Sequence, residues 1–165
     1  MNPQGNPMLT PLENITTRLD ANGWEYEACE EEGCVTARFH TDSAQFRLQV
    51  VADEREGGFQ VTTFFPSRVP AAHRVPVAVF CSYANFGLSL GRLEFNPDDG
   101  ELRTTVEVPY ERGNLPGKVI VDAIDCSTTL AELFHPAIMS IVYGGRDPKT
   151  AYQAMHHGDD EAKSA

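Results

Sequence analysis

Two short runs of alternating apolar and polar residues, 24–29 and 34–39, flank the turn-like sequence Glu-Glu-Glu-Gly at residues 30–33. Folding the chain at this turn sets the apolar residues of the two runs opposite each other: Trp24 opposite Phe39, Tyr26 opposite Ala37, and Ala28 opposite Val35. The same register places Glu25 opposite Arg38 on the other face, as oppositely charged neighbours. Because a slip of one residue would turn every apolar side chain to the wrong face, the pattern predicts an antiparallel hairpin in this register.

The alternation continues after this hairpin. Apolar residues recur at every second position over 46–52, and a similar alternation follows with Phe59, Val61, Thr63 and Phe65. These runs predict two more strands and hence a four-stranded antiparallel meander with one apolar face. Farther along, residues 93–95 and 102–108 flank the turn sequence Pro-Asp-Asp-Gly, which predicts a second hairpin.

The first helix is predicted from its ends. Thr10 and Glu13 form a capping box, and Pro11 takes the first helical position. Asn22-Gly23 ends the helix. The start of the helix also marks the start of the folded domain, because residues 1–9 have the composition of a loose tail.

Three more helices follow later in the chain. Residues 70–86 predict a middle helix whose apolar stripe contains Val75, Val79 and Tyr83, with Phe80 nearby. A long amphipathic helix is predicted over 116–143. A short final helix begins at Asp147-Pro148, an N-cap followed by a first-position proline.

These elements predict an α+β protein of the order α-β-β-β-β-α-β-β-α-α, in which helices pack on one face of an antiparallel sheet. Residues 10–156 are expected to form a single domain. Residues 157–165 are expected to form a disordered acidic tail.

The charge of the chain limits its partners. Asp and Glu number 24 against 13 Lys and Arg, so the formal net charge is −11. This balance argues against nucleic acid and against anionic membranes as partners, since both are bound through clustered basic residues. No basic leader with an apolar run and no apolar stretch long enough for a membrane span is present, so a cytoplasmic location is expected. A basic or apolar segment of another protein suits such an acidic surface.

Candidate metal and redox residues are few. Cys29 and Cys34 face each other across the predicted hairpin, on its polar side, and whether they ever form a disulfide stays open. No second Cys or His pair has the spacing of a zinc site. His156-His157 precedes three acidic residues, but adjacent histidines in a loose tail are not preorganised for a metal. We therefore expect no metal and no cofactor.

No catalytic motif is found in the sequence. The glycines form neither a phosphate loop nor a dinucleotide fingerprint, and no serine lies in a nucleophile elbow. Catalytic residues that are distant in sequence would escape such a search. The sequence thus favours a non-catalytic protein, and a small enzyme with a dispersed active site is the alternative.

Several short motifs occur in an order and spacing that resemble the YbjN family, over roughly residues 24–151. They are Phe64-Phe65-Pro66, Val69-Pro70, Arg74-Val75, Asn85, Leu90-Gly91-Arg92-Leu93-Glu94-Phe95, Asp99-Gly100-Glu101-Leu102-Arg103, Pro136-Ala137-Ile138, Val142-Tyr143-Gly144-Gly145, Pro148 and Ala151. The family is proposed to act in bacterial sensory transduction, and its fold resembles that of class I type III secretion chaperones.

The resemblance implies the same order of elements that the residue periods predict, and it brings no catalytic residues to this chain. It implies a protein-binding module, chaperone-like or regulatory, with a protein partner of unknown identity. Asn85 matches a recurrent asparagine of the family, which would close the middle helix and bond the following turn. One departure is that four strands precede the middle helix here, where secretion chaperones usually have three.

A homodimer is the last expectation. The long helix is apolar beyond its main stripe, at Ile120, Ile124, Leu133 and Met139. A helix that is apolar on two sides needs burial on two sides, so these residues are a candidate partner or dimer surface. The resemblance adds that chaperones of this fold commonly form two-fold dimers. The alternative is that the first and last helices cover this second side within one subunit.

Overall fold

The computed structural model describes residues 10–53, 58–109 and 116–162 of the chain. Its elements, in chain order, are α1 (Pro11–Ala21), β1 (Tyr26–Cys29), β2 (Cys34–His40), β3 (Gln45–Asp53), β4 (Gly58–Phe64), the 3₁₀ turn η1 (Ala71–His73), α2 (Arg74–Gly87), β5 (Arg92–Phe95), β6 (Leu102–Pro109), α3 (Gly117–Val142) and α4 (Pro148–Ala162).

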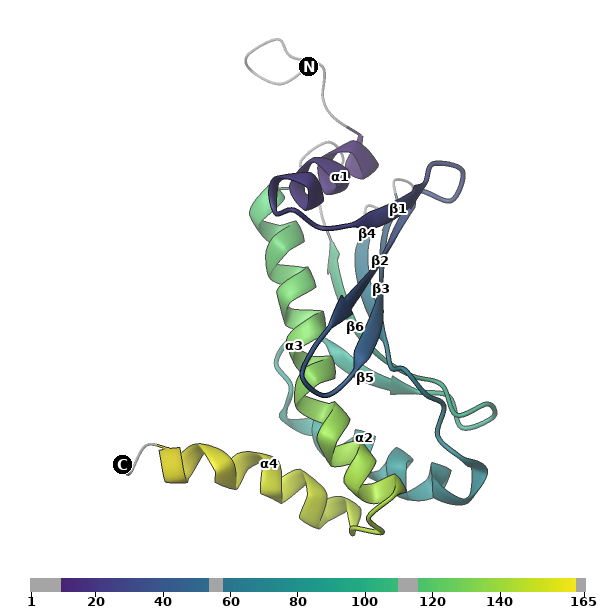
Figure 1. The fold of residues 1–165 in the computed structure, drawn as a ribbon, viewed down its shortest axis with the longest axis vertical. Helices are drawn as coiled ribbons and strands as arrows, with labels where there is room; N and C mark the ends of the chain where they lie inside the picture. The colour runs from purple at the N-terminus through teal and green to yellow at the C-terminus, as the bar shows by residue number, and fades with distance from the viewer. Residues whose placement is uncertain (1–9, 54–57, 110–115, 163–165) are drawn as a thin grey trace.

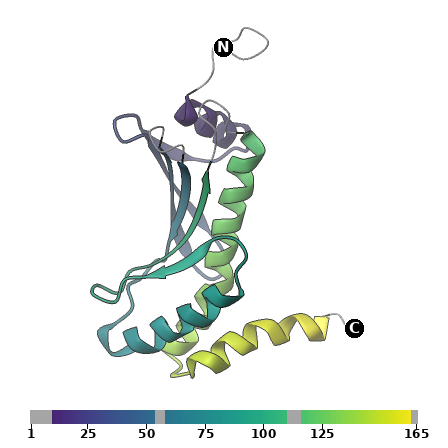
Figure 2. The same cartoon turned by 180° about the vertical axis from the view of Figure 1, so that it is seen from behind.

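The strands form one sheet in the order β1-β2-β3-β4-β6-β5, and every neighbouring pair is antiparallel. Figures 1 and 2 show α3 lying along one face of this sheet, with α1 at one end and α2 at the other. Among the described elements, none covers the opposite face. The α+β class, the element order and the packing of helices on one face are therefore confirmed.

The first hairpin has the expected register. Tyr26 pairs with Ala37, and Ala28 pairs with Val35. The ladder begins at Tyr26, so Trp24 precedes it, but the Trp24 ring still lies 6.5 Å from the Phe39 ring, centroid to centroid. Both rings pack against the core, whereas Glu25 and Arg38 are exposed.

The helix ends follow the local sequence signals. The Thr10 hydroxyl accepts a hydrogen bond from the Glu13 amide, and the Glu13 carboxylate accepts one from the Thr10 amide, which completes the predicted capping box. The Asn85 side chain bonds both the amide and the carbonyl of Leu93, at 2.8 Å each. This asparagine thereby fixes the end of α2 to strand β5.

The core between the sheet and the helices has two apolar clusters. One lies under α1 and the N-terminal half of α3, and the other lies among α2, α4 and the C-terminal half of α3. Three fully buried hydroxyl residues occupy the region where α3 crosses β4 and β6: Thr63, Thr104 and Ser127. The Thr63 and Ser127 hydroxyl oxygens are 2.9 Å apart, and Thr104 donates to the Ser127 carbonyl at 2.8 Å. These bonds satisfy the hydroxyl groups of all three residues.

The end of the chain differs from the prediction. The Asp147 carboxylate accepts a hydrogen bond from the Thr150 amide and caps α4 where expected. However, α4 continues to Ala162, so residues 157–162, expected to belong to a disordered tail, are helical. The expected tail at 1–9 lies outside the described residues.

Candidate protein-binding surface

Helix α2 has two apolar faces, and only one of them is buried. Val77, Phe80, Cys81 and Ala84 face the core. Val75, Val79, Tyr83 and Phe86 follow one another at spacings of four, four and three residues, so they share the opposite face. We name this second set the α2 face. The sequence interpretation that assembled Val75, Val79 and Tyr83 into one stripe was therefore right about their alignment, but the stripe points away from the core.

The α2 face is well exposed. The exposed fraction is 95% for Phe86 and 75% for Val75. Tyr83 is less exposed because its ring stacks on Tyr152 of α4, at 5.9 Å between centroids. Leu90, just after the helix, is a further large apolar side chain that is 52% exposed. A cluster of large exposed apolar side chains on one helix face is typical of an interaction surface.

The α2 face also lacks negative charge. The helix contains no Asp or Glu, although the chain carries 24 of them. Its one basic residue, Arg74, points elsewhere and donates to the carbonyl oxygens of Pro97 and Asp98. The α2 face is therefore a neutral apolar region on an acidic protein.

The residues expected to form a partner surface on the long helix are placed differently. Ile120 and Ile124 are buried, with exposed fractions of 0% and 4%, because α1 packs across the N-terminal half of α3. This corrects the expectation for these two residues. Met139 is half-buried against the second cluster, and Leu133 is 48% exposed. The second apolar side of α3 is thus covered mainly within the subunit.

The cysteines are free thiols. Cys29 and Cys34 are opposite each other across the first hairpin, as the register predicted. Burial raises the pKa of Cys34, and nearby Glu32 raises it further. Burial also raises the pKa of Cys126, and that of Cys81 to about 12. A raised pKa keeps a thiol protonated and weakens it as a nucleophile or metal ligand.

No group of three or more His, Cys, Asp or Glu side chains within the described ranges is placed to hold a metal ion. Surface hollows lie beside β3 and β4, under the start of α1, and along β5, and each contains at most one side chain with a shifted pKa. In the last of these, burial alone would raise the pKa of Glu94, but hydrogen bonds from Arg92, Thr105 and Arg103 outweigh burial and lower it. A lowered carboxyl pKa among arginines is typical of a structural ion-pair network, whereas a general acid would need a raised pKa.

His135 is the one described buried side chain with an unpartnered polar atom, Nδ1. The residue is 7% exposed, and its ring lies edge-on to Phe46, at 5.5 Å between centroids. Burial in this aromatic setting lowers its pKa. Burial therefore favours the neutral form of the His135 imidazole in the folded protein.

The buried histidine predicts an acid-dependent loss of stability. An unfolded histidine binds a proton at about pH 6.5, whereas the folded one resists protonation until lower pH. The free energy of unfolding of the wild type, relative to a His135→Leu variant, should be constant above about pH 6.5. It should fall as the pH drops from there to the folded pKa. Urea unfolding from pH 8 to pH 5 measures this, with the exposed His40→Leu as control, and parallel profiles for wild type and His135→Leu would contradict it.

Comparison with known proteins agrees with this architecture. The crystal structure of YbjN, a putative transcription regulator from E. coli, superposes with a TM-score of 0.57 at 13% identity and covers 92% of this chain and 97% of its own. The ExsC-ExsE complex gives a TM-score of 0.52 at 10% identity, covering 76% and 90% of the two chains. The HopA1-SchA chaperone-effector complex gives 0.43 at 10% identity, covering 72% and 90%. No curated protein matches the chain by sequence.

The described helices include none with the length and apolar character needed to cross a lipid bilayer. The fold is shared with the crystal structures of YbjN and of the ExsC-ExsE complex. A sequence model of the YbjN family, described as "Putative bacterial sensory transduction regulator", matches residues 11–139. The chain belongs to the YbjN family.

Proposed function

We propose that this chain is a non-catalytic, chaperone-like or regulatory protein-binding module that forms a homodimer through the α2 face. The observation that carries the proposal is the exposed apolar row of Val75, Val79, Tyr83 and Phe86. Burying such a row removes large apolar side chains from water, which is the main driving force of protein association. The fold it shares with ExsC, a protein solved in complex with ExsE, supports a binding role.

A second copy of the chain is the proposed occupant because of charge. Two chains of formal charge −11 repel each other over most of their surfaces. The α2 faces are free of acidic residues, so a two-fold contact between them brings apolar side chains together without opposing carboxylates. We also propose a cytoplasmic location, which suits a protein with free thiols.

Sedimentation equilibrium at micromolar concentration tests the dimer. The wild type should have the mass of two chains, since each contributes several large apolar side chains to the contact. A Val79→Asp/Phe86→Asp variant should have the mass of one chain, because two carboxylates would be buried in the contact and would weaken the association of the two chains by about a hundredfold or more.

The control is Tyr143→Asp, which places one carboxylate at a residue that is 74% exposed on a different element. This variant should stay dimeric. A mass of one chain for the wild type across the concentration range would remove the homodimer from the proposal, and a dimeric Val79→Asp/Phe86→Asp variant would move the contact away from α2.

A further inference from the structure

The open face of the sheet carries two arginines side by side. Arg38 on β2 and Arg47 on β3 are direct cross-strand partners, and both side chains are exposed on the face opposite α3. Like charges directly opposite each other in a sheet repel and destabilise the pair. The β2–β3 pairing itself therefore gives no reason for two neighbouring arginines.

Within the described part of the chain, neither Arg38 nor Arg47 has a carboxylate within ion-pair distance. Other arginines of the same sheet end are paired: Arg68 with Asp99 and Glu101, Arg92 with Glu94 and Glu107, and Arg103 with Glu94. Glu25, which the sequence placed opposite Arg38, precedes the β1 ladder and makes no such pair. Arg38 and Arg47 are thus neighbouring cations without a carboxylate partner, on a chain with 24 acidic and 13 basic residues.

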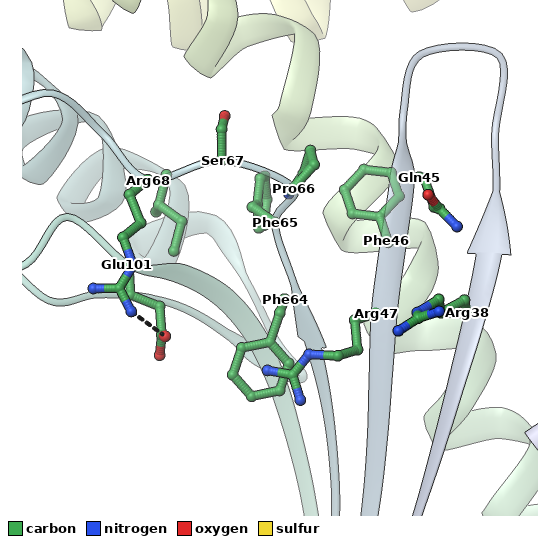
Figure 3. Close-up of a pocket in the computed structure, with 11 residues that line it drawn as sticks. Arg38, Gln45, Phe46, Arg47, Phe64, Phe65, Pro66, Ser67, Arg68 and Glu101 are labelled. Atoms are coloured by element: carbon green, nitrogen blue, oxygen red, sulfur yellow. Dashed lines mark ion pairs between the residues drawn. The ribbon is translucent and has the colours of Figure 1, made fainter. Parts of the chain in front are cut away.

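Arg47 is also held in place. Its guanidinium carbon lies 3.8 Å from the centroid of the Phe64 ring, in a cation–π contact with the residue paired to it on β4. Figure 3 shows Arg47 reaching from β3 toward Phe64, with Arg38 beside it. A guanidinium stacked on a ring keeps its N–H groups free for an anion, and little conformational entropy is lost when one binds.

The two arginines border a hollow of about 370 Å³. Phe64, Phe65 and Pro66 supply apolar lining, and Gln45 and Ser67 supply neutral polar groups. The hollow is open to solvent along the end of the sheet. Arg68 lines the side away from Arg38 and forms an ion pair there with Glu101. Such a site combines anion recognition with apolar contact, as a short peptide segment requires.

We propose that Arg38 and Arg47 bind carboxylate side chains of an acidic segment in a protein partner, with Phe64, Phe65 and Pro66 contacting the apolar parts of that segment. The inference rests on the proposed protein-binding function and supplies the chemistry of the bound segment. Charge complementarity carries it, because each arginine can hold a carboxylate through two parallel hydrogen bonds. The acidic remainder of the surface disfavours a long polyanion such as nucleic acid, so a short acidic segment is the occupant.

The test is fluorescence anisotropy with a labelled peptide of ten glutamates, in low salt. The wild type should bind it, and binding should weaken as salt is raised. An Arg38→Ala/Arg47→Ala variant should bind about tenfold or more weakly. The matched control is Lys118→Ala/Lys149→Ala, which removes the same two charges from exposed residues on α3 and α4, and it should bind within about twofold of the wild type.

Each outcome decides between the explanations. No binding by the wild type, or equal losses in the two double variants, would overturn the proposal. Competition by inorganic phosphate at concentrations where acetate has no effect would assign the site to phosphate instead of carboxylate. The Arg38→Ala/Arg47→Ala variant should melt close to the wild-type temperature, because the loss of the repulsive pair offsets the loss of the cation–π contact with Phe64, so weak binding would not reflect unfolding. The variant should keep the mass of a dimer in sedimentation equilibrium. A failed peptide-binding prediction is therefore distinguishable from a failed prediction of the α2 dimer contact.

Discussion

A Phe80→Ala variant should lose about 3–5 kcal/mol of unfolding free energy, whereas Phe86→Ala, six residues later on the same helix, should change it by about 0.5 kcal/mol or less. Phe80 is fully buried, and its ring meets Phe134 of α3 edge-on, at 6.0 Å between centroids. Truncating it leaves a cavity between α2 and α3 that neighbouring side chains fill only in part. Phe86 is 95% exposed and leaves no cavity.

Urea unfolding of both variants measures this difference. Dimer formation adds stability that depends on protein concentration, so the titrations should be repeated over a range of concentrations and compared at the dilute limit. Leu90→Ala, another exposed apolar residue near the end of α2, serves as a second surface control. Equal losses at Phe80 and Phe86 would mean that α2 is rotated about its axis relative to the structure described above.

The first hairpin shows what the sequence could predict. Its register follows from the alternation of Trp24, Tyr26 and Ala28 against Val35, Ala37 and Phe39, because one buried face leaves a single consistent pairing. The α1 capping box was predictable for a similar reason, since Thr10 and Glu13 are three residues apart and need no distant partner. Local patterns with a single physical solution are thus readable without a structure.

The orientation of α2 was not predictable in this way. The helix has apolar residues on both sides, so its period alone gives two solutions. The choice between them is made by tertiary contacts, in which Phe80 meets Phe134 of α3 and Asn85 ties the helix end to β5. A helix with two apolar faces should therefore be interpreted as having one buried face and one candidate interaction face.

The long helix α3 also has two apolar sides, but both are mainly buried. Ile120 and Ile124 indicated a second apolar side, which is correct, but α1 covers them within the subunit. Element order does not tell where the first helix packs, so the sequence left the homodimer and the internal cover as alternatives. The Arg38–Arg47 pair could be predicted only in part. The alternation placed Arg38 on the outward face, but its neighbour Arg47 follows from the register between β2 and β3.

Gly100→Ala is expected to cost about 3–5 kcal/mol, although the change adds a single methyl group. Gly100 closes the turn between β5 and β6 with a φ of +80°, which is unfavourable for any residue with a Cβ. A Cβ at this position would also lie 2.3 Å from the carbonyl oxygen of Val69 and 3.0 Å from its amide nitrogen. Both neighbours are backbone atoms, so relief requires the segment before η1 to move away.

That movement would break a further contact, because the Val69 amide donates to the Gly100 carbonyl at 2.8 Å. Gly145→Ala is the matched control: Gly145 has a similar φ of +61°, but a Cβ there meets no atom within 4 Å. The control should lose only the conformational part, about 1–2 kcal/mol. The difference between the two variants in urea titrations then isolates the steric clash with Val69. Equal losses of unfolding free energy in the two variants would mean that a Cβ at Gly100 does not clash with Val69. The segment leading into α2 would then be held by other contacts, such as those of Arg74 with the Pro97 and Asp98 carbonyls.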